Sequence, residues 1–520
     1  MKKLIAVILT VLMILPMGCL ALASHEEYPT VYVIGAHKNE IFNAEGKKIY
    51  PLDADIKAIA KSALAPCLEE LAFGTAKGDY SELAKELTKA IEPVFGEVIL
   101  DKNGDVSNGS YTMFYTSTEN VEGKTSGYGV WDARFWYDWR ESPIKTAAEL
   151  KVHIDNVLKA TGKTKVQLIG RCYGANVIAA YIGLYKDHAK KYVSDISYYS
   201  SSVLGIDFMS ALFAGELYLD DKAIDNFLDY YIENEELIKD DEGAVLVSVV
   251  FDILREVKAL GITGDMLLDF INVFKDDFMP EIIRSTFGGW LSYWSMTTPE
   301  MYEKARDYIF ATDELRKEYA GFIKKADDFH YNVQLKTIDT MKELSDAGIN
   351  FYNFTKYNFP EVPVYEGARA QGDGDTTVFR QSFGATASDY NEVFSKEYLD
   401  SVSPENLKYI SPDKKIDAST CLFPDKTWFV KDLHHDYFGP LQDMSVEIMR
   451  YDMTVDNEKY PQFLTHTGKG DVVVNELIPT VGTDEDFDKP ESNIFASLVR
   501  FITAIINYLR KLFTEGFPKK

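Results

Sequence analysis

A glycine-flanked cysteine constrains the fold of this chain more than any other sequence feature. The motif Gly170-Arg171-Cys172-Tyr173-Gly174 follows a short apolar run at 165–169 and precedes an apolar helical segment at 175–185. Small residues two positions before and two positions after the central residue are what a strained strand-to-helix turn requires, because larger side chains would collide with neighbouring backbone. The motif therefore predicts a nucleophile elbow with Cys172 at its apex. The alternative is a buried cysteine at a tight turn.

Strand and helix patterns alternate on both sides of this motif. The strands predicted from short β-branched or aromatic runs are 30–35, 165–170, 195–199, 349–354 and 427–430. The helices predicted from apolar spacing are 146–158 and 175–185. This alternation predicts an α/β fold with a mostly parallel sheet flanked by helices.

The segment 205–346 interrupts this alternation. It shows helical periodicity with many aromatic residues, and it is too long for an ordinary connection between two elements. We therefore expect a large helical cap inserted into the α/β core. Its aromatic side chains either form the core of the cap or line a pocket for apolar substrate.

Both ends of the chain differ from its centre. Lys2 and Lys3 precede an apolar run and the small-residue site Ala21-Leu22-Ala23, which predicts a bacterial-type signal peptide and a secreted or envelope-associated protein. A lipoprotein signal acylated at Cys19 is the alternative. Residues 493–514 form an amphipathic pattern with a basic polar face, which suits contact with an anionic membrane surface or docking on protein.

These patterns divide the chain into six segments. They are a signal peptide (1–23), the first part of the α/β core (24–204), the helical cap (205–346), the second part of the core (347–455), an acidic linker (456–492) and an amphipathic C-terminal helix (493–520).

Charge, metal-ligand motifs and cysteine count limit which partners, cofactors and disulfides we expect. The formal net charge is −26, with 81 acidic and 55 basic residues, so nucleic acid is not an expected partner. No His-Glu-x-x-His motif or cluster of Cys and His with metal-ligand spacing occurs, and we expect neither a metal nor another cofactor. Three cysteines remain after signal removal, so at least one thiol is free or bridges two molecules. A Cys67–Cys421 pair would leave Cys172 free.

A Cys172 thiol at an elbow can become a nucleophile toward an acyl carbonyl. A neighbouring imidazole and the start of the following helix both favour the thiolate. The backbone N–H of Tyr173 would face the developing oxyanion. A second donor is expected from the Gly35-Ala36-His37 loop after the first strand, and we assign it to the Ala36 N–H.

On such a scaffold the acid and the histidine follow the nucleophile in that order. The best acid candidate lies in the motif Gly372-Asp373-Gly374-Asp375-Thr376-Thr377-Val378, after the 349–354 strand. The histidines beyond it are His434, His435 and His466, of which the first two follow the 427–430 strand. The alternatives are a polar turn or ion-binding loop for the acidic motif and a surface turn for the histidine pair.

Taken together, these motifs resemble the lecithin:cholesterol acyltransferase family of α/β hydrolases, which includes lysosomal phospholipase. Tyr137-Asp138-Trp139-Arg140 is similar to the family's Tyr-Asp-Trp-Arg motif, and Val33-Ile34-Gly35 is similar to its oxyanion motif. In the family's acid motif the Asp three residues before the Val is catalytic, which implies Asp375 here. The histidine motif implies His434 as the base, with the adjacent His435 as the alternative.

The elbow departs from this family, because Arg171 and Cys172 replace the usual His and Ser. A Gly-x-Cys-x-Gly elbow with a Cys-His-Asp triad is also found in dienelactone hydrolases. The resemblance implies an acyl-ester hydrolase or O-acyltransferase of lipid-like esters that works through an acyl-enzyme on Cys172. The alternatives are a catalytically inactive hydrolase fold used for surface or envelope binding, and a cysteine peptidase or amidase.

Overall fold

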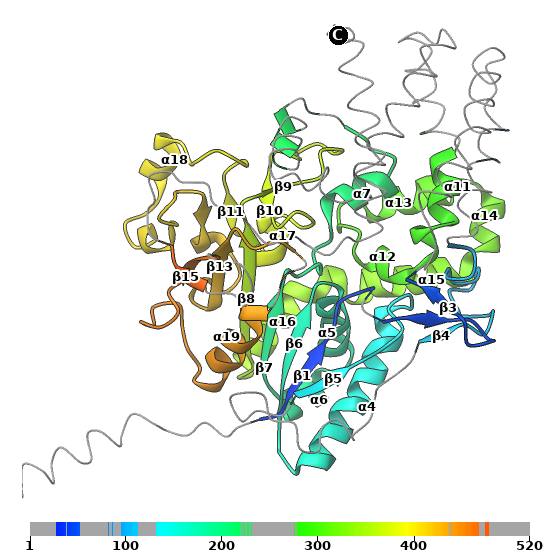
Figure 1. The fold of residues 1–520 in the computed structure, drawn as a ribbon, viewed down its shortest axis with the longest axis horizontal. Coiled ribbons are helices and arrows are strands. Elements are labelled where there is room, and N and C mark those ends of the chain that lie inside the picture. Colours follow the sequence, from blue (N-terminus) through cyan, green and yellow to red (C-terminus); the bar gives the residue numbers. More distant parts are fainter. Residues whose placement is uncertain are drawn as a thin grey trace, which may run out of the picture.

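The computed structural model describes residues 28–37, 39–51, 95–112, 132–218, 278–435, 439–466 and 474–477, together with residues 82, 86, 220, 222, 223, 226, 227, 230, 275 and 437. Four predicted features lie outside these residues: the signal peptide (1–23), Cys67, the middle of the cap (231–274) and the C-terminal helix (493–520). Figure 1 follows the described chain from β1 to β15.

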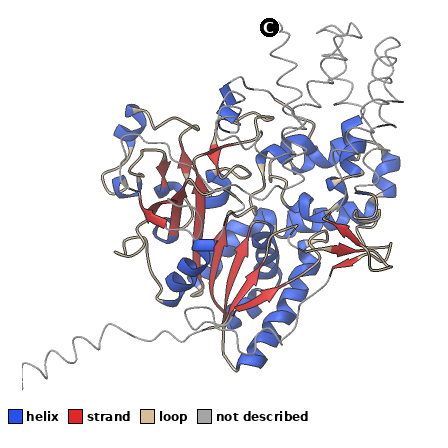
Figure 2. Cartoon of the chain, viewed as in Figure 1, coloured by secondary structure: helices blue, strands red, loops and turns tan. Residues whose placement is uncertain are grey.

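One eight-stranded sheet forms the centre of the fold, drawn in red in Figure 2. Its strand order is β5 (Asp132–Phe135), β1 (Thr30–Val33), β6 (Val166–Arg171), β7 (Val193–Tyr199), β8 (Asn350–Tyr357), β13 (Thr427–Lys431), β14 (Phe463–His466) and β15 (Val474–Glu476). Neighbouring strands are parallel except β14 and β15, which are antiparallel. The predicted α/β class with a mostly parallel sheet is confirmed.

The two faces of the sheet bury different layers, because successive side chains of a strand point to opposite sides. The helices beside the sheet are α4 (Pro143–Thr161), α5 (Tyr173–Leu184), α6 (Lys186–Tyr192), α16 (Thr337–Asp346), α17 (Val378–Ser382) and α19 (Gly439–Arg450). Val31 and Leu168 join a core that includes the apolar residues of α4 and α5. Tyr32 and Ile169, their neighbours in sequence, join a second core with residues of α19. Burial on both faces accounts for the nearly continuous apolar runs of these strands.

Helix α4 has well-defined signals at both ends. The Ser142 side chain accepts a hydrogen bond from the Ile144 N–H, and Pro143 occupies the first helical position. Gly162 ends the helix with a φ of 67°, in the left-handed region that favours glycine. These signals set the two ends of α4, which packs against α5.

The described part of the 205–346 segment is helical. Its helices, apart from α16, are α7 (Asp207–Phe213), α11 (Met279–Arg284), α12 (Leu291–Ser295), α13 (Tyr302–Ile309), α14 (Asp313–Glu318) and α15 (Ala320–Asn332). Figure 1 shows most of them gathered beyond one end of the central sheet. Phe213 and Trp294 are 0% and 1% exposed, so these aromatic residues form the core of the cap. Asn176 of α5 ties the cap to the sheet layer by donating to the Ser295 carbonyl at 2.9 Å.

The prediction of a linker at 456–492 is wrong where the structure describes this segment. The strand β14 extends the sheet beside β13, and β15 pairs with β14. His466 belongs to β14, and its Nδ1 lies 3.2 Å from the Asp432 carbonyl oxygen. Strand β14 is only four residues long, only Phe463 and Leu464 in it are apolar, and it lies among acidic and polar residues, which is why composition suggested a linker.

Besides short 3-10 helices, the remaining described elements are three small sheets and one short α-helix. They are β2 (Ile41–Phe42) with β3 (Lys48–Tyr50) and β4 (Tyr111–Thr112), β9 (Phe359–Pro360) with β10 (Gln371–Gly372), β11 (Thr386–Ala387) with β12 (Ile416–Asp417), and α18 (Lys396–Ser401). Cys421 is a buried free thiol, and Cys67, its suggested partner, lies outside the described residues. Within the described residues, no helix combines the length and apolarity needed to cross a membrane.

Candidate active site

The elbow cysteine occupies a strained position between a strand and a helix. Cys172 follows the last residue of β6 and precedes Tyr173, the first residue of α5, with φ 47° and ψ −122°. A positive φ at a residue with a side chain costs on the order of 1–3 kcal/mol and is common at functional sites. A Cβ on Gly174 would lie 2.2 Å from the Val33 carbonyl oxygen, and one on Gly170 would lie 2.8 Å from Ile178 Cδ1. Both flanking glycines are therefore required by the turn.

The elbow also lies where the strand order changes direction. From β1 the chain moves outward to β5 and then returns to β6 on the other side of β1. In open parallel sheets, ligands bind at the carboxyl ends of the strands beside such a switch. The chain has an α/β-hydrolase fold.

The loop after β1 approaches the elbow closely. A Cβ on Gly35 would lie 3.4 Å from Cys172 Cβ, so the Gly35 backbone lies directly beside the thiol-bearing residue. Ala36 follows and is partly buried against the first core. The N–H of Tyr173, as the first helical residue, has no acceptor inside its helix. The two predicted oxyanion donors therefore come from adjoining segments.

The Tyr137-Asp138-Trp139-Arg140 motif supports this loop. The Tyr137 hydroxyl donates to the Ile34 carbonyl, and the Trp139 Nε1–H donates to the Asn39 carbonyl at 3.3 Å. Burial and then the charge of Cys172 raise the pKa of Tyr137, as expected for a phenol held near the elbow.

The other half of this motif is a buried ion pair. Arg140 is 0% exposed and donates two hydrogen bonds to Asp138, from Nε to Oδ1 at 2.9 Å and from Nη2 to Oδ2 at 2.6 Å. A third bond, at 2.9 Å, joins Nη1 to Ser110 Oγ. The pair fixes the segment that carries Tyr137 and Trp139.

An aspartate and a histidine from the second part of the core meet near the elbow. His435 Nδ1 lies 2.9 Å from Asp373 Oδ2, and the His435 backbone N–H donates to the Asp373 carbonyl at 2.9 Å. Asp373 is 0% exposed and accepts two further backbone bonds at Oδ1, from Asp375 and Thr376. The carboxylate is thus held in one orientation, with one oxygen directed at the imidazole.

The sequence predicted Asp375 as the orienting acid and His434 as the first-choice base, but neither belongs to the hydrogen-bonded pair. Asp375 lies on the other side of the His435 ring, with Oδ2 3.9 Å from Nε2. The His434 ring lies against Phe359, and a Cβ on Gly374 would be 2.9 Å from His434 Nε2. The hydrogen-bonded pair is therefore Asp373 with His435, the alternative histidine, and not the pair Asp375 and His434 that the sequence favoured.

Electrostatics favours an ionised pair. Burial alone would lower the pKa of His435, but the charges of Asp373, Cys172 and Asp375 raise it well above its usual value. Burial alone would raise the pKa of Asp373, but the charge and hydrogen bond of His435, together with Lys356, hold it below its usual range. The buried histidine and aspartate therefore carry opposite charges beside the elbow.

Lys356 positions the histidine loop, and the sequence analysis missed it. The side chain is 0% exposed, and its Nζ donates to the carbonyl oxygens of His434 (3.1 Å), His435 (2.8 Å) and Tyr437 (2.7 Å). The one signal was the single charged residue of strand β8, a lysine among aromatic, Asn and Thr residues.

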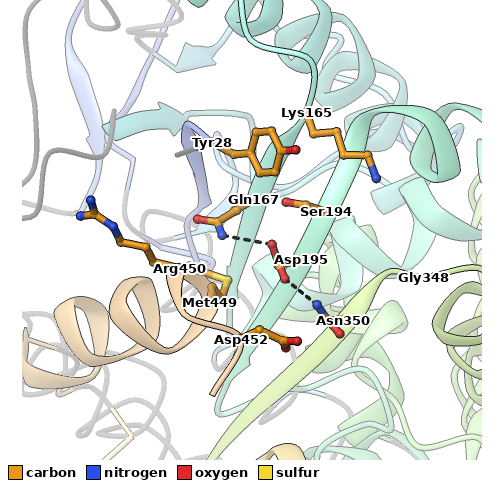
Figure 3. A pocket seen from close by; sticks show the side chains of 10 residues that line it. All are labelled: Tyr28, Lys165, Gln167, Ser194, Asp195, Gly348, Asn350, Met449, Arg450 and Asp452. Carbon is orange, nitrogen blue, oxygen red and sulfur yellow. Dashed lines mark hydrogen bonds between the residues drawn. The ribbon is translucent and has the colours of Figure 1, made fainter. Parts of the chain in front are cut away.

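The cavity in Figure 3 lies elsewhere. It has a volume of about 120 Å³ and is lined by Gln167, Asp195 and Asn350, which lie toward the amino ends of their strands. Asp195 accepts hydrogen bonds from both amides at 3.0 Å. These contacts join the three neighbouring strands β6, β7 and β8 near their amino ends, whereas the elbow lies at the carboxyl end of β6. Among the described residues, no three His, Cys, Asp or Glu side chains are grouped to hold a metal ion.

Comparisons with known proteins add little to this geometry. No family model matches the chain, and no curated protein matches it. Among solved structures, the chain is similar to one in the crystal structure of the Tle4-Tli4 complex, at 13% identity and a TM-score of 0.22, over 63% of this chain and 75% of that chain. A likeness at this level supports no inference about function.

A buried carboxyl beside the acid loop yields a stability prediction. Glu361 is 1% exposed, and neither of its carboxyl oxygens has a hydrogen-bond partner among the described residues. Burial and then the charges of Asp373, Asp207 and Asp375 raise its pKa well above the usual range. The folded protein therefore keeps a proton that the unfolded chain releases above about pH 4.5, and stability falls as pH rises from there toward the raised pKa.

Glu361→Gln removes this proton uptake. Relative to the parent, the variant should become more stable from pH 5 to pH 9, by up to about 1.4 kcal/mol per pH unit. Urea unfolding at pH 5, 7 and 9 measures the difference, with Glu366→Gln at an exposed glutamate as the control. A constant difference at all three pH values would show that Glu361 ionises normally in the folded protein.

Proposed function

We propose that this protein is an acyl-ester hydrolase or O-acyltransferase of lipid-like esters, which works through a covalent acyl-enzyme on Cys172 with His435 as base and Asp373 as its orienting acid. The observation that carries the proposal is the 2.9 Å contact between His435 Nδ1 and Asp373 Oδ2 in a fold whose elbow holds a cysteine. With Nδ1 bound to the carboxylate, Nε2 is the nitrogen available for proton transfer.

The reaction follows the usual order for such a site. His435 takes the Cys172 proton, and the thiolate attacks the acyl carbonyl. The N–H groups of Tyr173 and Ala36 stabilise the oxyanion. As the carbon–oxygen bond breaks, the leaving alkoxide takes the proton from His435, which leaves an acyl thioester. Water or an alcohol, deprotonated by His435, then attacks the thioester. The carbon–sulfur bond breaks, Cys172 takes the proton back from His435, and the acid or a new ester is released.

The substrate class rests on the resemblance and on the cap. The resemblance to the lecithin:cholesterol acyltransferase family suggests lipid-like esters, and a cap rich in aromatic residues lies at the end of the sheet that carries the elbow. We also propose that residues 1–23 direct export and that residues 493–514 contact the membrane surface that presents the substrate.

Trapping the acyl-enzyme tests the proposal. Incubating the full chain with 4-nitrophenyl esters of increasing chain length should add one acyl group, found by mass spectrometry on Cys172. Cys172→Ala should lose the adduct, and Cys172→Ser should keep some turnover.

Cys421→Ala is the matched control, because burial raises the pKa of this second thiol to about 11 and keeps it protonated. If Cys172→Ala turned over esters at the parent rate, the proposal would be wrong. If the parent formed no adduct and no product, the chain would be an inactive hydrolase fold with a binding role.

A further inference from the structure

A chain of three side chains leads from the interior to the oxyanion loop. His37 directly follows Ala36 and has a φ of 62°. Its Nδ1 lies 2.5 Å from the Tyr50 hydroxyl, and its Nε2 lies 2.7 Å from the Tyr293 hydroxyl. Tyr293 belongs to α12 of the cap and is 3% exposed. The chain thus joins the cap to the loop beside Cys172.

The aromatic surroundings hold this chain in place. The Trp139 ring centroid lies 4.1 Å from that of His37, and the Trp290 centroid lies 5.6 Å away. Trp290 is itself fixed, because its Nε1–H donates to the Val98 carbonyl at 3.1 Å. The imidazole therefore has little freedom to rotate away from either hydroxyl.

A neutral imidazole has one donor and one acceptor nitrogen, so the hydrogen bonds along this chain can run in either of two directions. If the Tyr50 hydroxyl donates to Nδ1, then Nε2–H donates to the Tyr293 oxygen. The Tyr293 hydroxyl then keeps its own proton for a further acceptor. In the opposite tautomer Tyr293 would donate to the ring and present only lone pairs to the site.

Tyr293 lies near the reacting groups. Gly35 adjoins Cys172, and His37 lies two residues further along the same loop. Burial, followed by the charges of Tyr50, Cys172 and Asp375, raises the pKa of the Tyr293 phenol well above its usual value. A phenol in this setting stays protonated, so its hydroxyl can donate a hydrogen bond to a substrate oxygen and keep its proton.

Resting on the proposed function, we infer that the Tyr293 hydroxyl, oriented by His37 and Tyr50, is a third oxyanion donor and hence a catalytic residue supplied by the cap. When Cys172 Sγ bonds to the acyl carbon, the carbonyl π pair moves to oxygen, and Tyr293 donates a hydrogen bond to that oxygen. When the bond to the leaving group breaks, the pair returns to re-form the carbonyl. Tyr293 holds its proton throughout.

The test compares two substrates on the full chain. Tyr293→Phe should lower kcat/KM for 4-nitrophenyl butyrate by about 10²- to 10³-fold, the usual loss for one oxyanion donor. For the thiono analogue, whose C=S sulfur is a weak acceptor, the loss should shrink to less than about tenfold. A purely structural role would lower both rates equally.

Tyr302→Phe is the control, since this buried cap tyrosine belongs to a different helix, α13, and its hydroxyl donates to Asp327 Oδ1 at 2.9 Å. It should leave both rates unchanged. Equal losses on both substrates for Tyr293→Phe, or no loss on either, would overturn the donor role while a Cys172 adduct still supported the proposed function. Parent-level turnover by Cys172→Ala would overturn both.

Discussion

Replacing His435 with alanine is expected to lower kcat/KM for an activated ester by about 10³- to 10⁴-fold, whereas His434→Ala should lose far less. The two histidines are adjacent, but the Nδ1 of His435 is the one held by Asp373 at 2.9 Å. The side chain of His434 packs against Phe359 instead. Steady-state hydrolysis of 4-nitrophenyl butyrate by both variants measures the difference.

The aspartates supply a paired comparison. Asp373→Asn should approach the loss of His435→Ala, because an amide no longer holds the imidazolium or fixes its tautomer. Asp375→Asn should have a smaller effect, since Asp375 lies 3.9 Å from the other ring nitrogen. A larger loss in the Asp375 variant would restore it as the orienting acid.

The second large effect concerns stability. Arg140→Met should lower the apparent free energy of unfolding by about 3–5 kcal/mol, because it leaves the Asp138 carboxylate buried without its counter-charge. The carboxylate is almost fully enclosed, and it has two hydrogen bonds from this one guanidinium. Urea unfolding followed by tryptophan fluorescence measures the change.

A double variant separates the buried charge from lost packing. Asp138→Asn with Arg140→Met removes both charges, so it should recover part of the stability lost in the single variant. If the double variant were as unstable as Arg140→Met plus Asp138→Asn added together, the two side chains would not be coupled. The activity of the single variant should also fall, since Tyr137 and Trp139 support the oxyanion loop.

The elbow and the central strands were predictable because each depends on a local pattern. Two glycines around Cys172, a preceding apolar run and a following apolar helix occur within about twenty residues of sequence, and the structure has the predicted turn. The strand at 427–430 likewise appears as β13. Such patterns arise because residues close together in the sequence are buried together, and the order of apolar residues shows this without a structure.

The pairing of acid with base was not predictable in this way. Asp373 and Asp375 are two residues apart in a glycine-rich loop, and which one faces His435 depends on how that loop turns around Asp373 Oδ1. Lys356 and Tyr293 escaped notice for the same reason, since their partners lie about 80 and 250 residues away. Long-range hydrogen bonds leave no periodicity in the chain.

The order of the site residues along the chain has a consequence for biosynthesis. Cys172 follows β6, whereas Asp373 and His435 follow β8 and β13, beyond the whole cap. A nascent chain that has not yet reached residue 435 therefore carries the thiol without the base that would activate it. On the proposed assignment the protein is latent until its last parallel strands dock, so partly synthesised chains pose no hazard to the esters of the cell that makes them.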